Sequence, residues 1–303
     1  MKNYSGILLF LLLILAVPAK SQTENYDWWI EKHDWDGVTH WTKYLIYSPE
    51  YFGPNALPVP ETMQGLIKKQ LSFEMSFENH RGYTGDITNN VFAQIYFPLF
   101  SDKAGINFSM VPVEFFSMDS QTRDKRRARN FDGKGHSVGD LYIGTHVQLV
   151  ENNPRWPDML LTINMRTASG SNLMSARFTD TPGYFFDLSF GKTYSLKRNV
   201  FNEIRTFGLL GFYVWQTNSD VLLQNDAFMY GLGARAKILD LFYLTNIWGG
   251  YIGYKNNGDQ PMVYRILLES AMDKKINYLF KYQKGLNDFP FHSFQIGFSA
   301  KPF

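Results

Sequence analysis

The stretch "LSFEMSFE" (residues 71–78) alternates between apolar and polar side chains without a break. Leu71, Phe73, Met75 and Phe77 would therefore share one face of an extended chain, with the serines and glutamates on the other. A period of two is typical of a β-strand with two different environments on its faces. Because a strand of a soluble β-sandwich would alternate in the same way, the rest of the chain has to decide the fold.

The same alternation recurs along most of the chain after residue 70. Regular runs occupy 71–78, 140–150, 159–167, 184–194, 262–270, 276–283 and 291–300, and less regular ones lie near 90–100, 105–116, 204–216, 227–238 and 242–254. Their apolar faces are rich in Phe, Tyr, Leu and Met over the whole length of each run, as a lipid-facing surface requires. The sequence thus predicts twelve antiparallel strands.

The connections between these runs support a barrel. If the first strand begins in the periplasm, the outer connections fall near 81–89, 118–139, 168–183, 217–226, 255–261 and 285–290. The inner ones fall near 101–104, 151–157, 195–203, 239–241 and 273–275 and are generally shorter. Long loops at one end and short turns at the other are characteristic of outer-membrane barrels. A soluble β-sandwich gives no reason for this alternation.

The last run, "FHSFQIGFSAKPF" (291–303), suggests how the sheet closes. A barrel in lipid has no open edge, so its final strand must pair with the first. We expect the run at 291–300 to pair with 71–78, and the terminal Phe303 to be read by the barrel assembly machinery. Pro302 interrupts the alternation and puts Phe303 out of step with the preceding apolar residues.

The start of the chain has the layout of a secretory signal peptide. Lys2 precedes the apolar run Ile7 to Val17, and small residues at 19 and 21 precede a cleavage point that would leave Gln22 as the first mature residue. The run is too short to cross a bilayer as a helix, and no later stretch reaches about 18 continuous apolar residues. An uncleaved anchor is the alternative. No cysteine follows the apolar run, so a lipid-anchored N-terminus is not expected.

Composition excludes several classes of function. Removal of residues 1–21 takes away Lys2 and Lys20 and leaves 28 basic residues against 28 acidic ones. A chain without net positive charge gives little support for nucleic-acid binding. The absence of cysteine rules out disulfides, thiol chemistry and cysteine metal sites. The six histidines show no metal-ligand spacing, and we expect neither a metal nor a cofactor.

Residues 22–69 differ from the rest of the chain. They are dense in Trp, Tyr and Pro and have no period of two; a short helix starting near Pro60 is the one element that we expect there. This extension would plug the lumen, cap the periplasmic mouth or contact an envelope partner. The alternative is that its aromatic residues simply pack locally.

If the regular apolar faces meet lipid, the opposite faces line the lumen. The candidates are Glu74, Glu78, Asn164, Arg166, Asp187, Arg265, Glu269 and Lys281, with Arg235, Lys237, His146 and Gln148 as further members of the set. One interpretation is a polar constriction that selects solutes. The other is a network of ion pairs that fills a narrow barrel.

One predicted outer connection carries a dense basic cluster. It contains Arg123, Lys125, Arg126, Arg127 and Arg129. These residues would bind lipopolysaccharide phosphates or attract anions, or else remain solvated. The nearby pair His136 and Ser137 contains the residue types of outer-membrane phospholipases, but neighbouring side chains on a strand point to opposite faces. We therefore name no catalytic residue.

Two adjacent segments carry a resemblance to a known family. "GHSVGDLYIG" (135–144) and "RWPDMLLTINMRTASG" (155–170) combine a Gly-Asp strand start, a Pro-Asp turn, a strand and a Ser-Gly end. They resemble the central part of outer-membrane proteins of the phenol-degradation meta-pathway type, which are uptake channels for aromatic or hydrophobic compounds. Residues 166–168, Arg-Thr-Ala, stand where that family tends to have a Thr-Pro pair. The resemblance implies a barrel and transport.

The sequence therefore predicts a signal peptide (1–21), an extension (22–69) and a transmembrane β-barrel (70–303) in the outer membrane of a Gram-negative bacterium, in contact with lipid and lipopolysaccharide. The leading functional hypothesis is passive passage of small solutes. An accessory barrel that docks an envelope partner is the second hypothesis, and a membrane-embedded lipid-modifying enzyme is the third.

Overall fold

The computed structural model describes residues 26–99, 102–196, 200–271 and 275–301. Its strands are β1 (Ser72–Gly82), β2 (Asp86–Pro98), β3 (Ala104–Met118), β4 (Lys134–Ser137), β5 (Tyr142–Val150), β6 (Asp158–Arg166), β7 (Gly183–Ser195), β8 (Phe201–Gln216), β9 (Gln224–Ile238), β10 (Phe242–Gly253), β11 (Met262–Ser270), β12 (Ile276–Asn287) and β13 (Phe291–Ala300). The expected signal peptide and the terminal Phe303 lie outside the described residues.

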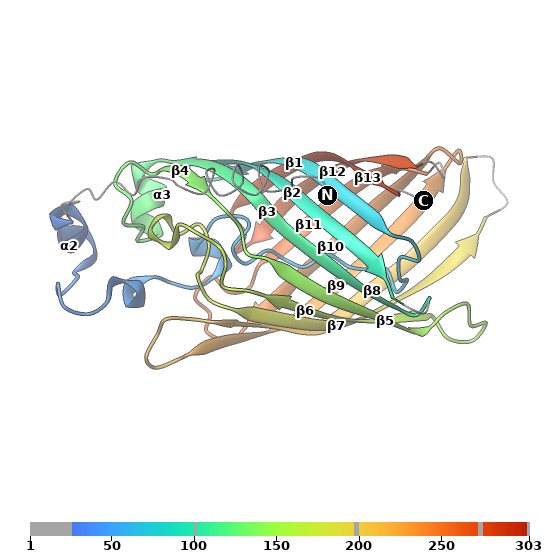
Figure 1. The fold of residues 1–303 in the computed structure, drawn as a ribbon, viewed down its shortest axis with the longest axis horizontal. Helices are drawn as coiled ribbons and strands as arrows, with labels where there is room; N and C mark the ends of the chain where they lie inside the picture. The colour runs from blue at the N-terminus through green and yellow to red at the C-terminus, as the bar shows by residue number, and fades with distance from the viewer. Residues whose placement is uncertain (1–25, 100–101, 197–199, 272–274, 302–303) are drawn as a thin grey trace, which may run out of the picture.

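Twelve of these strands form a closed antiparallel barrel (Figure 1). Each strand pairs with its neighbours in sequence order, and β1 closes the ring by pairing with β13, so that Met75 faces Phe298. The predicted fold and the predicted closure between 71–78 and 291–300 are confirmed. The sequence did not predict β4, which pairs only with β3 within a long loop, nor the short helix α3 (Ser120–Lys125) before it.

The alternation in "LSFEMSFE" separates the two surfaces of the barrel wall. Met75 and Phe77 are 38% and 50% exposed on the outer surface, whereas Ser76 and Glu78 are buried inside. Aromatic and aliphatic side chains on other strands, such as Phe212, Trp248 and Ile296, are likewise exposed on the outer surface. This is the surface that a transmembrane barrel presents to lipid. None of the helices in the described ranges is long and apolar enough to span a membrane.

The two ends of the barrel differ. We call the end with the connections 83–85, 119–141, 167–182, 217–223, 254–261 and 288–290 the loop end, and the opposite end, where β1 begins and β13 finishes, the turn end. The expected contrast in length holds for 119–141 and 167–182. It does not hold for 83–85 and 288–290, which are tight turns because β1, β2 and β12 extend further than the sequence pattern suggested.

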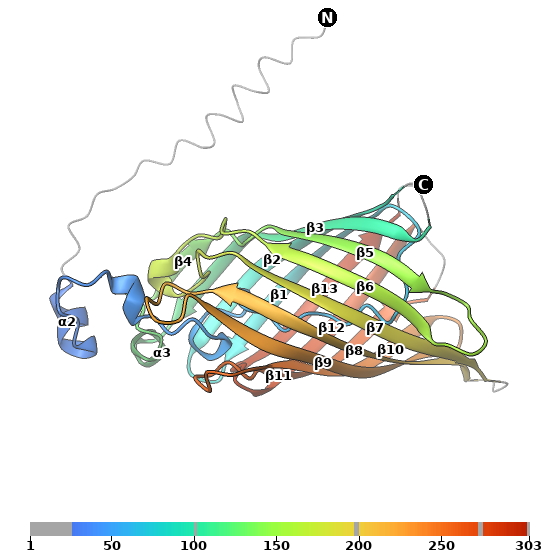
Figure 2. The ribbon, with the colours of Figure 1, turned by 90° about the horizontal axis from the view of Figure 1, so that it is seen from below.

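The N-terminal region starts outside the barrel at the loop end. It contains α2 (Asp27–His33) and the 3₁₀ turns η1 (Trp41–Tyr44) and η2 (Pro49–Tyr51). Figures 1 and 2 both place α2 beyond the end of the barrel that carries α3 and β4. The indole nitrogen of Trp29 donates a hydrogen bond to the carbonyl of Arg127, 3.1 Å away, which fastens α2 to the loop that follows β3.

Residues 53–69, which we call the threaded segment, run through the inside of the barrel from the loop end to the turn end. At the loop end, the amide of Gly53 donates to the carbonyl of Ala176. At the turn end, Gln148 of β5 accepts from the amide of Ile67, and Lys69 pairs with Glu151 at 2.7 Å. The segment is extended apart from turns at 54–56 and 64–65, so the helix predicted near Pro60 is not formed.

Apolar side chains of the threaded segment complete the interior packing. Leu57 and Val59 lie in one buried cluster with Tyr213, Met229 and Tyr251 of the wall. Burying an aliphatic side chain of this size contributes roughly 1.5–3 kcal/mol. The segment is therefore part of the folded core as well as a filling of the lumen.

Candidate functional site

Three arginines on the inner wall bind the backbone of the threaded segment. Arg166 of β6 donates to the carbonyl of Ala56. Arg205 of β8 donates to the carbonyl of Gln64 at 2.8 and 3.1 Å from two of its nitrogens. Arg265 of β11 donates to the carbonyls of Val59 and Pro60, the latter at 3.0 Å. Because a peptide in a barrel interior has no strand to pair with, these bonds satisfy carbonyl groups that would otherwise be costly to bury.

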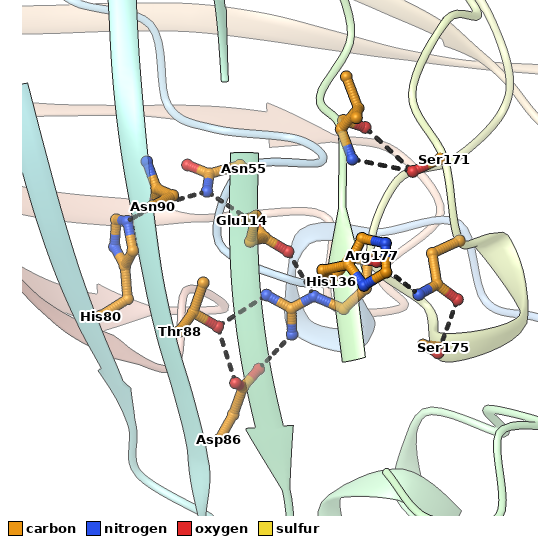
Figure 3. A network of polar contacts seen from close by, with 12 residues as sticks. Asn55, His80, Asp86, Thr88, Asn90, Glu114, His136, Ser171, Ser175 and Arg177 are labelled. Atoms are coloured by element: carbon orange, nitrogen blue, oxygen red, sulfur yellow. Dashed lines mark hydrogen bonds and ion pairs between the residues drawn. The ribbon is translucent and has the colours of Figure 1, made fainter. Parts of the chain in front are cut away.

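A buried ionic network closes around the start of the segment at the loop end (Figure 3). The guanidinium of Arg177, in the loop 167–182, donates to Glu114 at 2.7 Å, to Asp86 at 2.8 Å and to Thr88 at 2.7 Å. Arg126 donates to the same Asp86 at 2.6 Å. Burial alone would lower the pKa of Arg177, but Asp86 and Glu114 outweigh it and hold this pKa above its ordinary value. The loop is thus tied to β2 and β3 by charges that are fully compensated.

The threaded segment joins this network through one side chain. The amide nitrogen of Asn55 donates to Glu114 at 2.8 Å and to Asn90 at 3.1 Å. Asn90 in turn contacts the ring of His80 at 2.9 Å, and His80 contacts Ser293 of β13 at 2.7 Å. Figure 3 shows this chain of contacts running from Arg177 to His80. We call Asn55, Asp86, Glu114, Arg126 and Arg177 the latch.

Apolar packing fills the loop end above the latch. Phe52 and Ala56 lie in a buried cluster with Phe116 and Met118 of β3 and with Ala176 of the loop 167–182. Gly53 sits against the guanidinium of Arg177, where a Cβ atom would lie 2.6 Å from Cζ. Loops and threaded segment together close this end of the barrel.

The basic cluster in the connection after β3 packs against the N-terminal region. The guanidinium of Arg129 lies within 3.6 Å of the ring centre of Tyr26 and within 5.3 Å of those of Trp29, Trp35 and Trp41. Such geometry is typical of cation–π contacts. The other four basic residues also have partners: Arg123 stacks on Trp28, Lys125 pairs with Glu50, Arg126 pairs with Asp86 and Arg127 donates to the carbonyl of Tyr44.

This arrangement differs from the solvated external loop that was one alternative at the level of sequence. Four of the five charges bind groups of residues 26–50, namely aromatic rings, the carboxylate of Glu50 and the carbonyl of Tyr44, because those residues fold back over the loop end. The dense Trp content of the N-terminal region was the available clue, since exposed arginines and tryptophans commonly stack.

A cavity of about 550 Å³ lies between the threaded segment and the barrel wall. Of the residues that were predicted to line the lumen, Glu74, Glu78, Asn164, Arg265, Glu269 and Lys281 border this cavity, as do Arg235 and His146. The remaining candidates lie apart from it. Arg166 and Gln148 bind the threaded segment, Asp187 is buried on the inner face of β7, and Lys237 pairs with Asp240 near a turn.

The charges that face the cavity are largely paired. Lys281 forms an ion pair with Glu61 of the threaded segment, and Lys68 lies 4.0 Å from Glu74. Glu78 accepts a hydrogen bond from Asn90 at 2.8 Å and lies 3.4 Å from His80. The lumen therefore combines both arrangements considered for these residues, namely a network of satisfied charges and a free polar space beside it.

The side chains of His136 and Ser137 do not meet in the structure. His136 is exposed whereas Ser137 is buried, because neighbouring residues of β4 point to opposite sides. No group of three or more histidine, aspartate or glutamate side chains in the described parts of the chain has the geometry of a metal site.

Comparison with solved structures identifies the kind of fold. An outer membrane channel from Pseudomonas putida F1 aligns with 80% of this chain and 99% of its own, with a TM-score of 0.51 and 9% identity. The transport unit of the autotransporter AIDA-I from Escherichia coli aligns with 85% of this chain and all of its own (TM-score 0.47, 8% identity). The KdgM porin aligns with 76% of this chain and 99% of its own (TM-score 0.43, 7% identity). No model of a known protein family matches the sequence, and no curated protein is detectably similar to it.

Proposed function

We propose that this protein is an outer-membrane channel that lets small solutes pass through the space beside the threaded segment. The observation that carries the proposal is the cavity of about 550 Å³ inside a closed transmembrane barrel. Its volume is in the range of small-molecule sites. The resemblance of residues 135–144 and 155–170 to the phenol-degradation channels extends the proposal to hydrophobic or aromatic compounds.

Passage requires the loop end to open. The latch and the apolar cluster around Phe52 close this end, and both involve the threaded segment. We propose that conduction follows a displacement of the latch, with the rest of the segment held in place by Arg205 and Arg265. The channel would then be closed at rest and open intermittently.

The location that we propose is the outer membrane of a Gram-negative bacterium, reached after removal of residues 1–21. With the turn end in the periplasm, as in barrels whose strands start and finish there, the loop end faces the outside. Residues 26–50 would then form a cap on the cell surface, where they and the basic cluster would meet lipopolysaccharide.

A second candidate is an accessory barrel that docks an envelope partner. The threaded segment and the packed loop end favour it, because a barrel that never opens still presents the cap of residues 26–50. In this case a partner would co-purify with the whole protein and would be lost when residues 26–50 are deleted.

Single-channel recording in planar bilayers tests the main proposal. We expect brief openings of the whole protein and more frequent openings when the latch is weakened by Asn55→Ala. Tyr184→Phe on the outer face of β7 is the matched control and should leave the openings unchanged. The channel would be contradicted, and the accessory barrel favoured, if no current were observed in any of three proteins. These are the protein with an intact latch, the Asn55→Ala variant and the protein without residues 22–69.

A further inference from the structure

The wall of the cavity is chemically divided. The residues that β2, β3, β5 and β6 place on the cavity include no carboxylate, lysine or arginine. The strand residues with such groups that border it come from β1, β9, β11 and β12, and examples are Glu74, Arg235 and Lys281. The strand residues on one side of the cavity are therefore uncharged, and we call this side the neutral wall; Asp140, in the connection that precedes β5, borders the cavity at its edge. The other side carries charged residues, several of which are paired.

The neutral wall contains a row of hydrogen-bonding side chains. Gln94 of β2 faces Ser109 of β3 across the sheet, and Ser109 faces Tyr142 of β5. Three neighbouring strands span about 10 Å at the usual interstrand spacing of ~4.8 Å. The row is therefore about as long as a small organic molecule, and all three residues border the cavity.

The side chains of this row have unused hydrogen-bonding capacity. Within the described parts of the chain, the amide of Gln94 and the hydroxyl of Ser109 have no side-chain partner. The buried hydroxyl of Tyr142 meets the hydroxyl of Tyr213, which also borders the cavity, and a hydroxyl with one such partner can still form a further hydrogen bond. By contrast, their neighbours Asn107 and His146 bind one another at 2.7 Å and are fixed. Polar groups enclosed in protein are normally satisfied, by protein, water or ligand.

The chemistry of the row defines a class of solute. Amide and hydroxyl groups both donate and accept, which matches hydroxyl groups on a solute. An ion placed against this wall would lose water without a counter-charge from the strand residues of the wall, and Glu74 and Lys281 across the cavity already have ion-pair partners. A purely apolar solute would leave the row unsatisfied. Aromatic rings at Tyr96, Phe185 and Tyr213 provide apolar contact beside the row.

We infer that the neutral wall is a binding site for an uncharged, hydroxyl-rich solute the size of a simple sugar or polyol, recognised by Gln94, Ser109 and Tyr142. This inference rests on the proposed channel and specifies the class of solute that it passes: a hydroxylated compound in place of the hydrophobic one that the sequence resemblance implies. The solute would enter the cavity from the turn end, beside Glu74 and Lys281, and lie against β2, β3 and β5.

Three probes with the same pyranose ring test the site: D-glucose, anionic glucuronate and cationic glucosamine. Binding to the full-length protein in micelles is followed by saturation-transfer difference NMR. We expect glucose to bind at least fivefold more tightly than either charged probe. The site would be wrong if glucuronate or glucosamine matched glucose, or if glucose did not bind.

Variants that remove only the polar atoms locate the binding. Ser109→Ala and Tyr142→Phe should each weaken glucose about 3- to 10-fold, the usual effect of one neutral hydrogen bond, and Gln94→Met should act in the same way. Tyr184→Phe, which removes a hydroxyl from the outer face, should leave glucose binding unchanged. Unaltered binding in the triple variant would overturn the assignment.

Conductance of the same preparations separates this inference from the proposed function. If glucose binds but the protein conducts no current, the binding site is supported and the proposed channel is wrong. If the protein conducts but glucose does not bind, the channel is supported and the proposed binding site is wrong.

Discussion

Arg265 donates a hydrogen bond to the carbonyl oxygen of Pro60, 3.0 Å away, although 205 positions separate the two residues in the sequence. This bond joins the wall of the barrel to a peptide that has no strand to pair with. It also shows that a positive charge of the lumen has a structural use. Charges on the inner face of a barrel therefore cannot be counted as determinants of selectivity until their partners are known.

The first prediction concerns this contact. Arg265→Met removes charge-assisted bonds to Val59 and Pro60 and leaves their carbonyls unsatisfied, so we expect a loss of about 1–3 kcal/mol. The temperature at which the barrel changes its migration on gels measures this loss. Arg155→Met, at an exposed turn residue, is the matched control. Equal effects of the two substitutions would show that the contact does not hold the segment.

The second prediction concerns the latch. Glu114→Gln leaves the fully buried Arg177 with Asp86 as its remaining carboxylate partner, which Arg177 shares with Arg126. Removing one partner of a buried pair costs about 3–5 kcal/mol when the other charge is left uncompensated, and we expect the lower part of this range. Limited proteolysis should cut the loop 167–182 faster. Lys125→Gln, which breaks a part-exposed pair with Glu50, should have an effect below about 1 kcal/mol.

The third prediction concerns topology and uses the absence of cysteine. Val38→Cys, at a position that is 90% exposed, should react with a membrane-impermeant maleimide on intact cells. Val221→Cys in the connection 217–223 should react in the same way, since it lies at the loop end and is 87% exposed. Arg155→Cys at the turn end should react only after permeabilisation. Protection of Val38→Cys alongside labelling of Val221→Cys would show that residues 26–50 do not lie outside.

The fourth prediction concerns pH. Burial raises the pKa of Asp140, whose carboxylate accepts a hydrogen bond from the amide of Gly170 at 2.6 Å. The folded state disfavours ionisation of this carboxyl group. The contribution of protonated Asp140 to the stability of the fold is therefore complete below pH 3.8, the ordinary pKa, and is lost as the pH rises through the raised pKa. Asp140→Asn should therefore stabilise the barrel at pH 7 and leave it unchanged at pH 3. Destabilisation at pH 7 that persists at pH 3 would show that ionisation is not the cause.

The barrel could be predicted from the sequence because a period of two identifies β-strands, and its recurrence along the chain, with longer and shorter connections in alternation, favours a barrel over a sandwich. Met75 and Glu78 occupy opposite faces as the alternation requires, and the pairing of β1 with β13 follows from the need to leave no edge in lipid. The ends of the strands were less predictable. Asp86 and Thr88 belong to β2, but the residues around them at the loop end are mostly polar, so the alternation of apolar and polar residues is lost there.

The path of residues 53–69 could not be predicted in the same way. Its fastening depends on backbone carbonyls, which every residue has, and on arginines that look like solute-binding groups in the sequence. The basic cluster was ambiguous for a related reason. The side chain of Arg129 is compatible with solvent, phosphate or aromatic rings, and only the fold shows that Tyr26 and Trp29 lie next to it.

The threaded segment also constrains the order of assembly. A chain that passes through a ring of paired strands cannot slip out sideways, because β1 is hydrogen-bonded on both edges. It can enter or leave only lengthwise, or be enclosed when the ring closes. A folded domain fused ahead of residue 26 could not follow the threaded segment through the closed barrel. The side of the membrane on which that domain remains would therefore be set when the last two strands pair and close the ring.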